Sequence, residues 1–382
     1  MRVGIPREVK DHEYRVAITP SGVRELTAAG HVVYVEREAG IGSSIPDSEY
    51  TGAGAKILPD PDDIWAEVDL ILKVKEPVAE EYHRLRRGQV LFAYLHLAAS
   101  RPCTEAILAS GVTAVAYETV QRPDGSLPLL APMSEVAGRM APQVAAHCLE
   151  REAGGRGILM GGVPGVSGAK VVVLGAGVSG MNAVAIALGM QAKVVLLDKD
   201  VEKLRQADRI YHGRLQTVAS NAYEIERACL DADLVIGAVL LAGAKAPTLV
   251  GNDLVARMKP GSVLVDISVD QGGCFEASRP TTHSDPTFVV HDSLFYCVAN
   301  MPGAVPHTST HALTNATVPY IEALASKGLA EACAINPGLA FGVSAIGGRL
   351  TSAPVAEAHG MQAVPMQAMV DELRAAPSPA AG

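Results

Sequence analysis

The chain has 382 residues, 48% of them hydrophobic, which at roughly 150 residues per domain corresponds to two or three domains with buried cores. A disordered or fibrous protein is therefore excluded. The formal net charge of -9 and the shortness of the densest basic run, residues 83–88, disfavour a nucleic-acid-binding protein.

The six cysteines show neither metal-ligand spacing nor a disulfide framework, so we expect reduced thiols. No apolar signal core opens the chain, and the longest apolar run, residues 234–244, falls far short of the roughly 20 residues that a membrane helix needs. We expect a soluble cytoplasmic protein.

Short β-branched segments alternate with helical patterns from the first residues on, which is typical of parallel sheets with helices on both faces. A helix fits at residues 20–30, because Pro20 suits a first turn and Gly30 is a stop signal. The expected strands of this first series are residues 2–5, 31–36, 69–74, 89–95 and 112–117.

A turn-rich connector at residues 122–132 interrupts the alternation, and a helical pattern at 134–150 follows it. After residues 300–310 the chain turns helical to about residue 329, so we expect its last part to pack on the first domain and residues 375–382 to be disordered. The expected strands of the second series are residues 170–175, 193–198, 215–220, 233–238, 262–267, 287–292 and 294–299.

The pattern G-x-G-x-x-G falls on Gly175, Gly177 and Gly180, directly after an expected strand and before a helix. Such glycines serve a tight turn, close approach to a pyrophosphate and close helix packing. The next strand ends at Asp198, whose carboxylate can accept from both ribose hydroxyls and repels a 2'-phosphate, although nearby lysines offset part of this repulsion. The pattern predicts NAD rather than NADP; glycines kept only for packing are the alternative.

Polar residues end several expected strands, where ligands bind in open α/β sheets. Lys75, His96 and Asp270 close three of them, and Arg15 lies in the loop after the first strand. Three of the four come from the first series, so we expect an active-site cleft between two domains. Guanidinium, ammonium and imidazole groups together suit hydride transfer involving a small polar acid.

Each of these residues also has a purely structural alternative. The alternatives are a satisfied core histidine for His96, a solvated strand end for Lys75 as for its neighbour Lys73, a turn cap for Asp270, and an ion pair of Arg15 with Glu8 or Glu13.

Several long motifs resemble the NAD-dependent alanine dehydrogenase family, from residue 1 to about residue 345. These motifs are MRVGIPREVK, EYRVAITP, LILKVKEP, LHLAAS, PLLAPMSEVAGRMA, GGVPGV, DISVDQGGCFE and HDSLFYCVANMP. The resemblance implies reversible oxidative deamination of L-alanine to pyruvate and ammonia with NAD. It also implies a homo-hexamer of chains with two Rossmann-like domains: residues 1–128 and 306–382 for substrate, and 129–305 for NAD.

The resemblance assigns roles by motif. Arg15 would bind the substrate carboxylate, Lys75 the carbonyl oxygen, His96 would be the general acid/base, and Asp270 its partner. The residues expected around the cofactor are Ser134, Gly175, Gly177, Val178, Gly180, Asp198, Lys203, Ser220, Val239, Leu240, Ile267, Asp270, Val298, Asn300 and Met301.

One departure from the family concerns a divalent ion that some relatives bind through an acid and a histidine one turn apart. Ala323 and Lys327 stand at those positions, and neither is an oxygen or imidazole ligand, so no metal is predicted. Two other functions stay open: the NAD-binding subunit of a proton-translocating transhydrogenase, and a non-catalytic NAD sensor.

Overall fold

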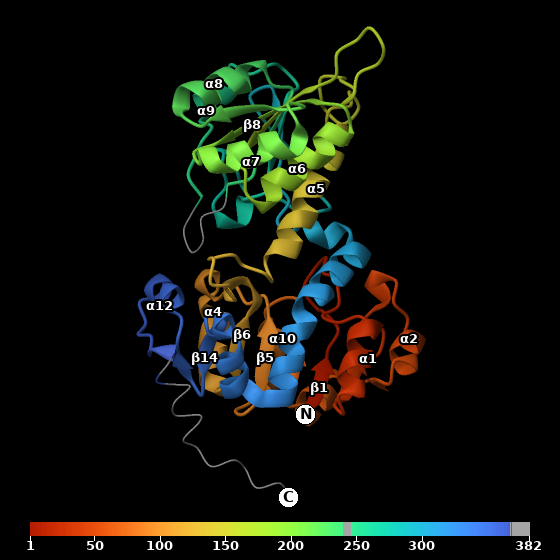
Figure 1. Cartoon of the computed structure of the whole chain (residues 1–382). Helices are drawn as coiled ribbons and strands as arrows, with labels where there is room; N and C mark the ends of the chain where they lie inside the picture. Colours follow the sequence, from red (N-terminus) through yellow and green to blue (C-terminus); the bar gives the residue numbers. More distant parts are fainter. Residues whose placement is uncertain (240–245, 367, 369–382) are drawn as a thin grey trace, which may run out of the picture. The chain divides into compact units, whose positions relative to one another are not determined.

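The computed structural model describes residues 1–239, 246–366 and 368. Contacts divide the chain into two compact units, Met1–Pro132 with Val305–Gly382, and Met133–Ala304. Each unit holds one sheet flanked by helices (Figure 1), so the predicted class of two doubly wound α/β units is confirmed. The six cysteines are buried free thiols, as expected.

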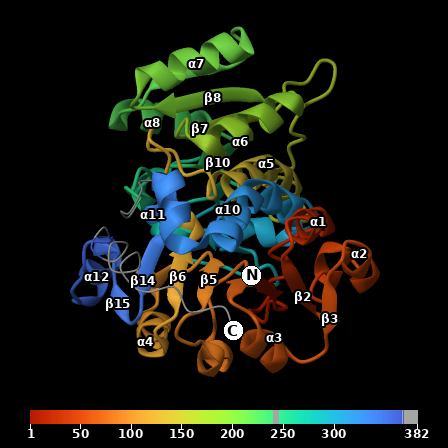
Figure 2. The ribbon, with the colours of Figure 1, turned by 60° about the horizontal axis from the view of Figure 1, so that its bottom comes forward.

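The sheet of the first unit has the order β15-β14-β6-β5-β4-β1-β2-β3, parallel from β6 to β3. The segment β3-β2-β1-β4-β5-β6 has the strand order of dinucleotide-binding folds, which reverses between β1 and β4. Figure 2 labels its outer strands β2, β3, β5 and β6. Its elements are β1 (Arg2–Ile5), α1 (Pro20–Ala28), β2 (Val32–Glu36), η1 (Ile41–Ser43), α2 (Asp47–Gly52), β3 (Lys56–Leu58), α3 (Pro61–Glu67), β4 (Leu70–Leu72), η2 (Ala79–Arg84), β5 (Val90–Ala93), η3 (Leu97–Ala99), α4 (Arg101–Ser110), β6 (Thr113–Ala116), η4 (Tyr117–Thr119), α10 (Pro306–Ile335), α11 (Pro337–Ala340), β14 (Val343–Ile346), β15 (Arg349–Leu350) and α12 (Ala353–His359).

Three strands of this sheet were not predicted. β3 has only three residues and lies at the sheet edge, so its sequence carries little periodicity. β14 and β15 form a hairpin through Gly347 and Gly348, whose φ angles of 57° and 88° suit a tight turn. β14 pairs with β6, so the C-terminal strands extend the first sheet and do not form a third one.

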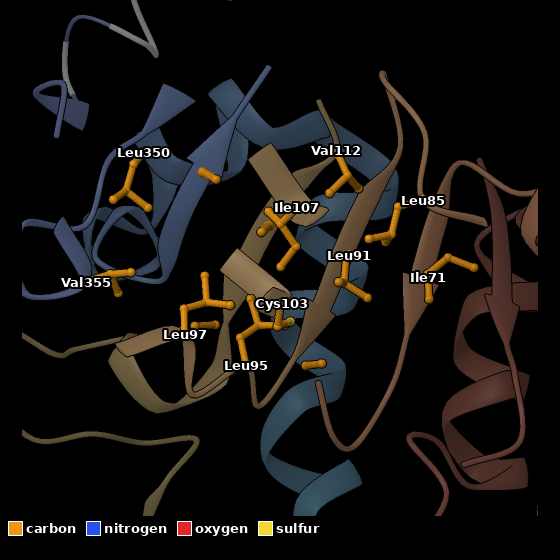
Figure 3. Packing of buried hydrophobic residues seen from close by; sticks show 14 of the residues in the cluster. Ile71, Leu85, Leu91, Leu95, Leu97, Cys103, Ile107, Val112, Leu350 and Val355 are labelled. Carbon is orange, nitrogen blue, oxygen red and sulfur yellow. The ribbon is translucent and has the colours of Figure 1, made fainter. Parts of the chain in front are cut away.

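The core of the first unit buries α3 and α4 against one face of the sheet (Figure 3). Ile71 on β4 and Leu91 on β5 belong to the same buried cluster as Trp65 on α3 and Ile107 on α4. α1 and α10 pack on each other, and a Cβ added to Gly22 would lie 2.9 Å from Val318. α1 begins as predicted, because the hydroxyl of Thr19 caps it ahead of Pro20.

The sheet of the second unit has the order β12-β13-β11-β10-β7-β8-β9, with only β12 antiparallel. This order also matches dinucleotide-binding folds and reverses between β7 and β10. Residues of α8 and α9 belong to the same buried cluster as the strands, and α6 and α7 pack on β7, β8 and β9. The elements are α5 (Ala131–Cys148), β7 (Lys170–Leu174), α6 (Val178–Gly189), β8 (Lys193–Asp198), α7 (Val201–Tyr211), β9 (Gln216–Ala219), α8 (Ala222–Asp231), β10 (Leu234–Gly237), α9 (Asn252–Val255), β11 (Val263–Asp266), η5 (Val269–Gln271), β12 (Thr287–Val290), β13 (Ser293–Tyr296) and η6 (Met301–Ala304).

Two further expectations concern a disordered C-terminus and the absence of a membrane-spanning helix. Residues 375–382, expected to be disordered, lie outside the described part of the chain. Within that part, none of the helices combines the length with the apolar composition that crossing a membrane requires.

Lys73 corrects one prediction, because it is not a solvated strand end. Its side chain is 1% exposed, and its Nζ lies 2.9 Å from Glu81 Oε1 and 3.2 Å from Glu8 Oε2. Burial alone would lower the pKa of Lys73, but the two carboxylates outweigh it and raise the pKa above its ordinary value. The sequence pattern of a lysine just past a strand does not distinguish this buried pairing from a solvated end.

We predict that Lys73→Met destabilises the protein by about 3–5 kcal/mol, because it leaves two buried carboxylates without their cation. Urea unfolding measures the change. Lys327→Ala is the control: Lys327 is exposed on α10 of the same unit, and its loss should cost no more than about 0.5 kcal/mol. Equal stability of the two variants would contradict the structural role of Lys73.

Candidate active site

The carboxyl ends of β1, β4, β5 and β6 form one edge of the first sheet. The loop after β1 runs on to Arg15, β4 leads to Lys75, and β5 leads to His96. The strand order reverses between β1 and β4, and open α/β sheets bind ligands outside such a reversal. The three residues predicted from the first series therefore lie at the edge where a ligand is expected.

Arg15 is buried and forms an ion pair with Glu13, the second of the two partners considered for it. Arg15 Nε donates to Glu13 Oε1 at 2.6 Å, and the two side chains are 2% and 0% exposed. Burial alone would raise the pKa of Glu13, but the hydrogen bonds and charge of Arg15 outweigh it and hold the pKa below its usual range. The pair therefore contributes stability above the ordinary glutamate pKa and loses it only as pH falls through the lowered value.

Glu13 and Tyr94 link Arg15 to the other two residues. The charge of half-buried Lys75 also lowers the pKa of Glu13, so both cations act on one carboxylate. The ring of buried Tyr94 stacks on the imidazole of His96, with centroids 6.1 Å apart and planes 17° apart, and burial raises the pKa of Tyr94 although the charge of Arg15 opposes this rise. We call Glu13, Arg15, Lys75, Tyr94 and His96 the carboxyl-edge cluster.

His96 is exposed, so the alternative of a satisfied core histidine is wrong. It sits in a left-handed backbone conformation, with φ 46° and ψ 37°, immediately before η3. Tyr94 was not predicted as a site residue, because a tyrosine in the run LFAYL is typical of a core strand. The one signal in the sequence was its position two residues before His96, near the carboxyl end of β5.

A cavity of about 350 Å³ adjoins the cluster on the side of Arg15. Its lining comes from residues 7–15 with Glu38, Ala39 and Gly42, so it includes Glu13 and Arg15 but neither Lys75 nor His96. Its volume is within the range of small-molecule sites, roughly 300–1,000 Å³.

Asp270 belongs to the second unit, on η5 just after β11, and it is exposed. The turn that carries it is fixed by Asp266, which the sequence analysis missed. Asp266 accepts from the backbone N–H groups of Ser268 at 2.9 Å and Cys274 at 2.7 Å, and burial raises its pKa. The convergence of Asp270 with the carboxyl-edge cluster stays a prediction.

The three glycines of the fingerprint have distinct surroundings at the strand-order reversal of the second sheet. Gly175 has φ 105°, and a Cβ there would lie 2.7 Å from Ala238 O beyond β10. A Cβ on Gly180 would lie 1.8 Å from Gly175 O, so the turn and α6 touch through backbone alone. Gly177, the N-cap of α6, has nothing within 4 Å of its Cβ position. A tight turn, close helix packing and an open approach to a helix N-terminus are what a pyrophosphate site needs.

Asp198 ends β8 and holds the glycine turn in place. Its Oδ2 accepts from Ala176 N at 2.6 Å and its Oδ1 from Asp200 N at 2.8 Å. An ionised carboxylate has about four lone-pair sites, so these bonds leave acceptor capacity for ribose hydroxyls. Ser220, after the next strand, donates its N–H to Asp198 O at 2.9 Å.

The remaining residues expected around the cofactor all belong to the second unit, except that Leu240 lies outside the described residues. Val239 follows β10, the strand beside β7, and Ile267 follows β11, the next strand beyond β10. Their contact with a cofactor stays a prediction. Of the other expected cofactor residues, Ser134 on α5 is half-buried, and Val178 on α6 and Lys203 on α7 are exposed. Val298 and Met301 are buried, and Asn300 between them has a positive φ of 65°.

Comparison with known proteins places the chain in a family. Residues 4–137 match the family model "Alanine dehydrogenase/PNT, N-terminal domain", and residues 141–353 match "Alanine dehydrogenase/PNT, C-terminal domain". The chain belongs to the alanine dehydrogenase/PNT family, as the motif resemblance predicted.

Among its relatives, an alanine dehydrogenase of Mycobacterium tuberculosis is 62% identical over 94% of this chain and 97% of its own length. One from Halomonas elongata is 53% identical over 97% of this chain and 100% of its own length. A solved L-alanine dehydrogenase superimposes with a TM-score of 0.91 at 48% identity, over 94% and 99% of the two chains. A transhydrogenase from Sinorhizobium meliloti gives 0.79 at 27% identity, over 92% and 99%.

We predict that alanine at two glycines of the fingerprint has different effects, a loss of NAD affinity at Gly177 and a loss of stability at Gly180. Gly177→Ala should leave stability within about 0.5 kcal/mol of wild type, since its Cβ meets no atom, but should weaken NAD binding at least about tenfold by filling the pyrophosphate approach. Gly180→Ala should destabilise the protein by about 1–3 kcal/mol through overpacking.

Thermal unfolding and NADH fluorescence titration measure the two effects. Gly189→Ala, at the exposed end of α6 where a Cβ also meets nothing, is the control and should change neither. NADH binding to Gly177→Ala as tight as to wild type would remove the glycine turn from the cofactor site.

Proposed function

We propose that the chain catalyses the reversible NAD-dependent oxidative deamination of L-alanine to pyruvate and ammonia. The observation that carries this proposal is the carboxyl-edge cluster, in which Arg15 bonds to Glu13, the charge of Lys75 lowers the pKa of the same carboxylate, and Tyr94 stacks on His96. Membership of the alanine dehydrogenase/PNT family supports it.

Arg15 and Lys75 bind the substrate at two points. A guanidinium carries five N–H donors, more than one carboxylate uses, so Arg15 can hold the substrate carboxylate while Glu13 orients it. Lys75 supplies the positive charge that binds and polarises the carbonyl oxygen of pyruvate. Because the carboxylate and the carbonyl oxygen of a three-carbon acid are each held by one residue, the orientation of its α-carbon and α-hydrogen is fixed for hydride transfer.

His96 and Asp270 handle protons and water. An α-hydrogen leaves as hydride only from the neutral amine, so His96 first takes the proton of the substrate ammonium. NAD, when bound, supplies the acceptor for that hydride. His96 releases the ammonium proton to solvent and then accepts a proton from the water that adds to the resulting iminium, which gives the carbinolamine. His96 returns that proton to the amino group, the C–N bond breaks and ammonia departs, while Asp270 accepts the proton of the carbinol hydroxyl as the carbonyl forms.

The second unit holds the cofactor. The open space at Gly177 and the acceptor capacity of Asp198 fit a dinucleotide, and the carboxylate favours the free 2'-hydroxyl of NAD. We propose residues 129–305 as the NAD domain and residues 1–128 with 306–382 as the substrate domain. The motif resemblance supports a cytoplasmic homo-hexamer.

We predict that the purified protein oxidises NADH only when pyruvate and ammonium are both present. His96→Ala should lower kcat at least about 100-fold through loss of the general acid/base. His83→Ala is the control, because His83 is exposed on η2 of the same unit, and it should keep wild-type kcat.

Other results of the same assay point elsewhere. Oxidation of NADH by pyruvate without ammonium indicates a hydroxy-acid dehydrogenase. Hydride transfer between nucleotides with no response to pyruvate indicates the transhydrogenase subunit. NADH binding without turnover, unchanged in His96→Ala, indicates a sensor.

We predict that Asp198→Asn raises the ratio of kcat/KM with NADP to kcat/KM with NAD by about tenfold, or about 1.4 kcal/mol, because the charge facing the 2'-position is removed. Asp200→Asn removes the same charge two residues away, where Asp200 caps α7, and should leave the ratio nearly unchanged. Equal ratios in the two variants would show that Asp198 does not select the cofactor.

A further inference from the structure

Two glutamates hold the backbone turns that carry Lys75 and His96. The Lys75 turn follows β4 and the His96 turn follows β5, which are neighbours in the first sheet. Glu8 follows β1, the other neighbour of β4, and Glu118 follows β6, the other neighbour of β5. Neither glutamate was singled out by the sequence analysis for this role.

Glu118 binds the backbone at His96. Its Oε1 accepts from His96 N at 2.7 Å, and both of its oxygens lie 3.2 Å from Leu95 N. His96 has φ 46°, a conformation that a residue with a side chain adopts only when its surroundings impose it. The bond from its own N–H to a carboxylate is such a constraint, because charge-assisted hydrogen bonds are the stronger kind.

Glu8 binds the backbone at Lys75. Its Oε1 accepts from Val74 N at 2.6 Å, and its Oε2 lies 3.4 Å from Lys75 N. The carboxylate is itself held in place, since it is buried and its Oε2 is 3.2 Å from Lys73 Nζ. Lys73 also bonds to Glu81, whose own backbone contact is with Val78 N at 3.0 Å, so the bonds to Val74 N and Lys75 N come from Glu8.

We propose that Glu8 and Glu118 are positioning residues, which fix Lys75 and His96 through the backbone so that one small acid meets both side chains. The proposal rests on the function proposed above. A loosened turn moves a functional group without removing it, and displacements near 1 Å can cost about 100-fold in rate.

The test compares Glu118→Ala and Glu8→Ala with wild type in NADH oxidation by pyruvate and ammonium. Glu118→Ala should lower kcat about 10- to 100-fold and displace the pH profile of kcat, since the general acid/base is misplaced. Glu8→Ala should raise KM for pyruvate about tenfold or more, since Lys75 is misplaced. Both should bind NADH as wild type does, because the cofactor residues belong to the other unit.

Two control variants separate positioning from stability. Glu81→Ala removes the other carboxylate of Lys73 without touching the Lys75 turn, so it should lower the melting temperature as Glu8→Ala does but keep KM. Asp69→Asn alters a carboxylate that accepts from Arg2 N at 2.9 Å at the opposite edge of the sheet, and should change neither kcat nor KM.

Wild-type kcat and pH profile in Glu118→Ala, together with wild-type KM in Glu8→Ala, would overturn the proposal. Should an alanine variant fail to fold, Glu118→Gln and Glu8→Gln carry the test, since each keeps one acceptor oxygen and should show the same effects more weakly; unchanged kinetics in both would equally overturn it. A wild-type protein without pyruvate-dependent activity would instead refute the proposed function.

Discussion

The buried ion pair between Glu13 and Arg15 is the interaction on which the candidate site depends. A guanidinium that is 2% exposed needs a partner, and Glu13 provides one at 2.6 Å while also acting on Lys75. The carboxylate therefore keeps two cations at one edge of the sheet, which would otherwise repel each other. The charge of Arg15 also opposes the burial that raises the pKa of Tyr94, and the Tyr94 ring stacks on His96, so residues far apart in the sequence gather in one cluster.

The strand order explains why this edge can hold such a cluster. In both sheets the order reverses beside the first strand of the series, so the connections after the two middle strands run to opposite faces and open a crevice at the carboxyl edge. The first sheet places charged side chains at its reversal. The second places backbone N–H groups and glycines there. In the function that we propose, one topology serves a small polar acid in one unit and a dinucleotide in the other.

The sequence predicted most of the strands, the glycine turn and the residues at the strand ends, because each has a strong local signal. It did not predict β3 or the hairpin β14–β15, which are short and depend on tertiary pairing. It misjudged Lys73, because the sequence of a strand end does not reveal that Glu8 and Glu81, from other segments, enclose the ammonium. Glu118 was missed for the same reason, since it follows β6 and binds the backbone after β5. Tyr94 was missed because the run LFAYL is typical of a core strand, so its stacking on His96 was not predicted.

The central claim is that Arg15, Lys75 and His96 act on one three-carbon acid. A crystal structure of the protein with NADH and pyruvate tests it most directly. The account predicts the pyruvate carboxylate on Arg15, its keto oxygen on Lys75, and His96 within hydrogen-bond reach of the reacting carbon's substituents. Pyruvate bound elsewhere, or Arg15 still occupied by Glu13 alone, would contradict the account.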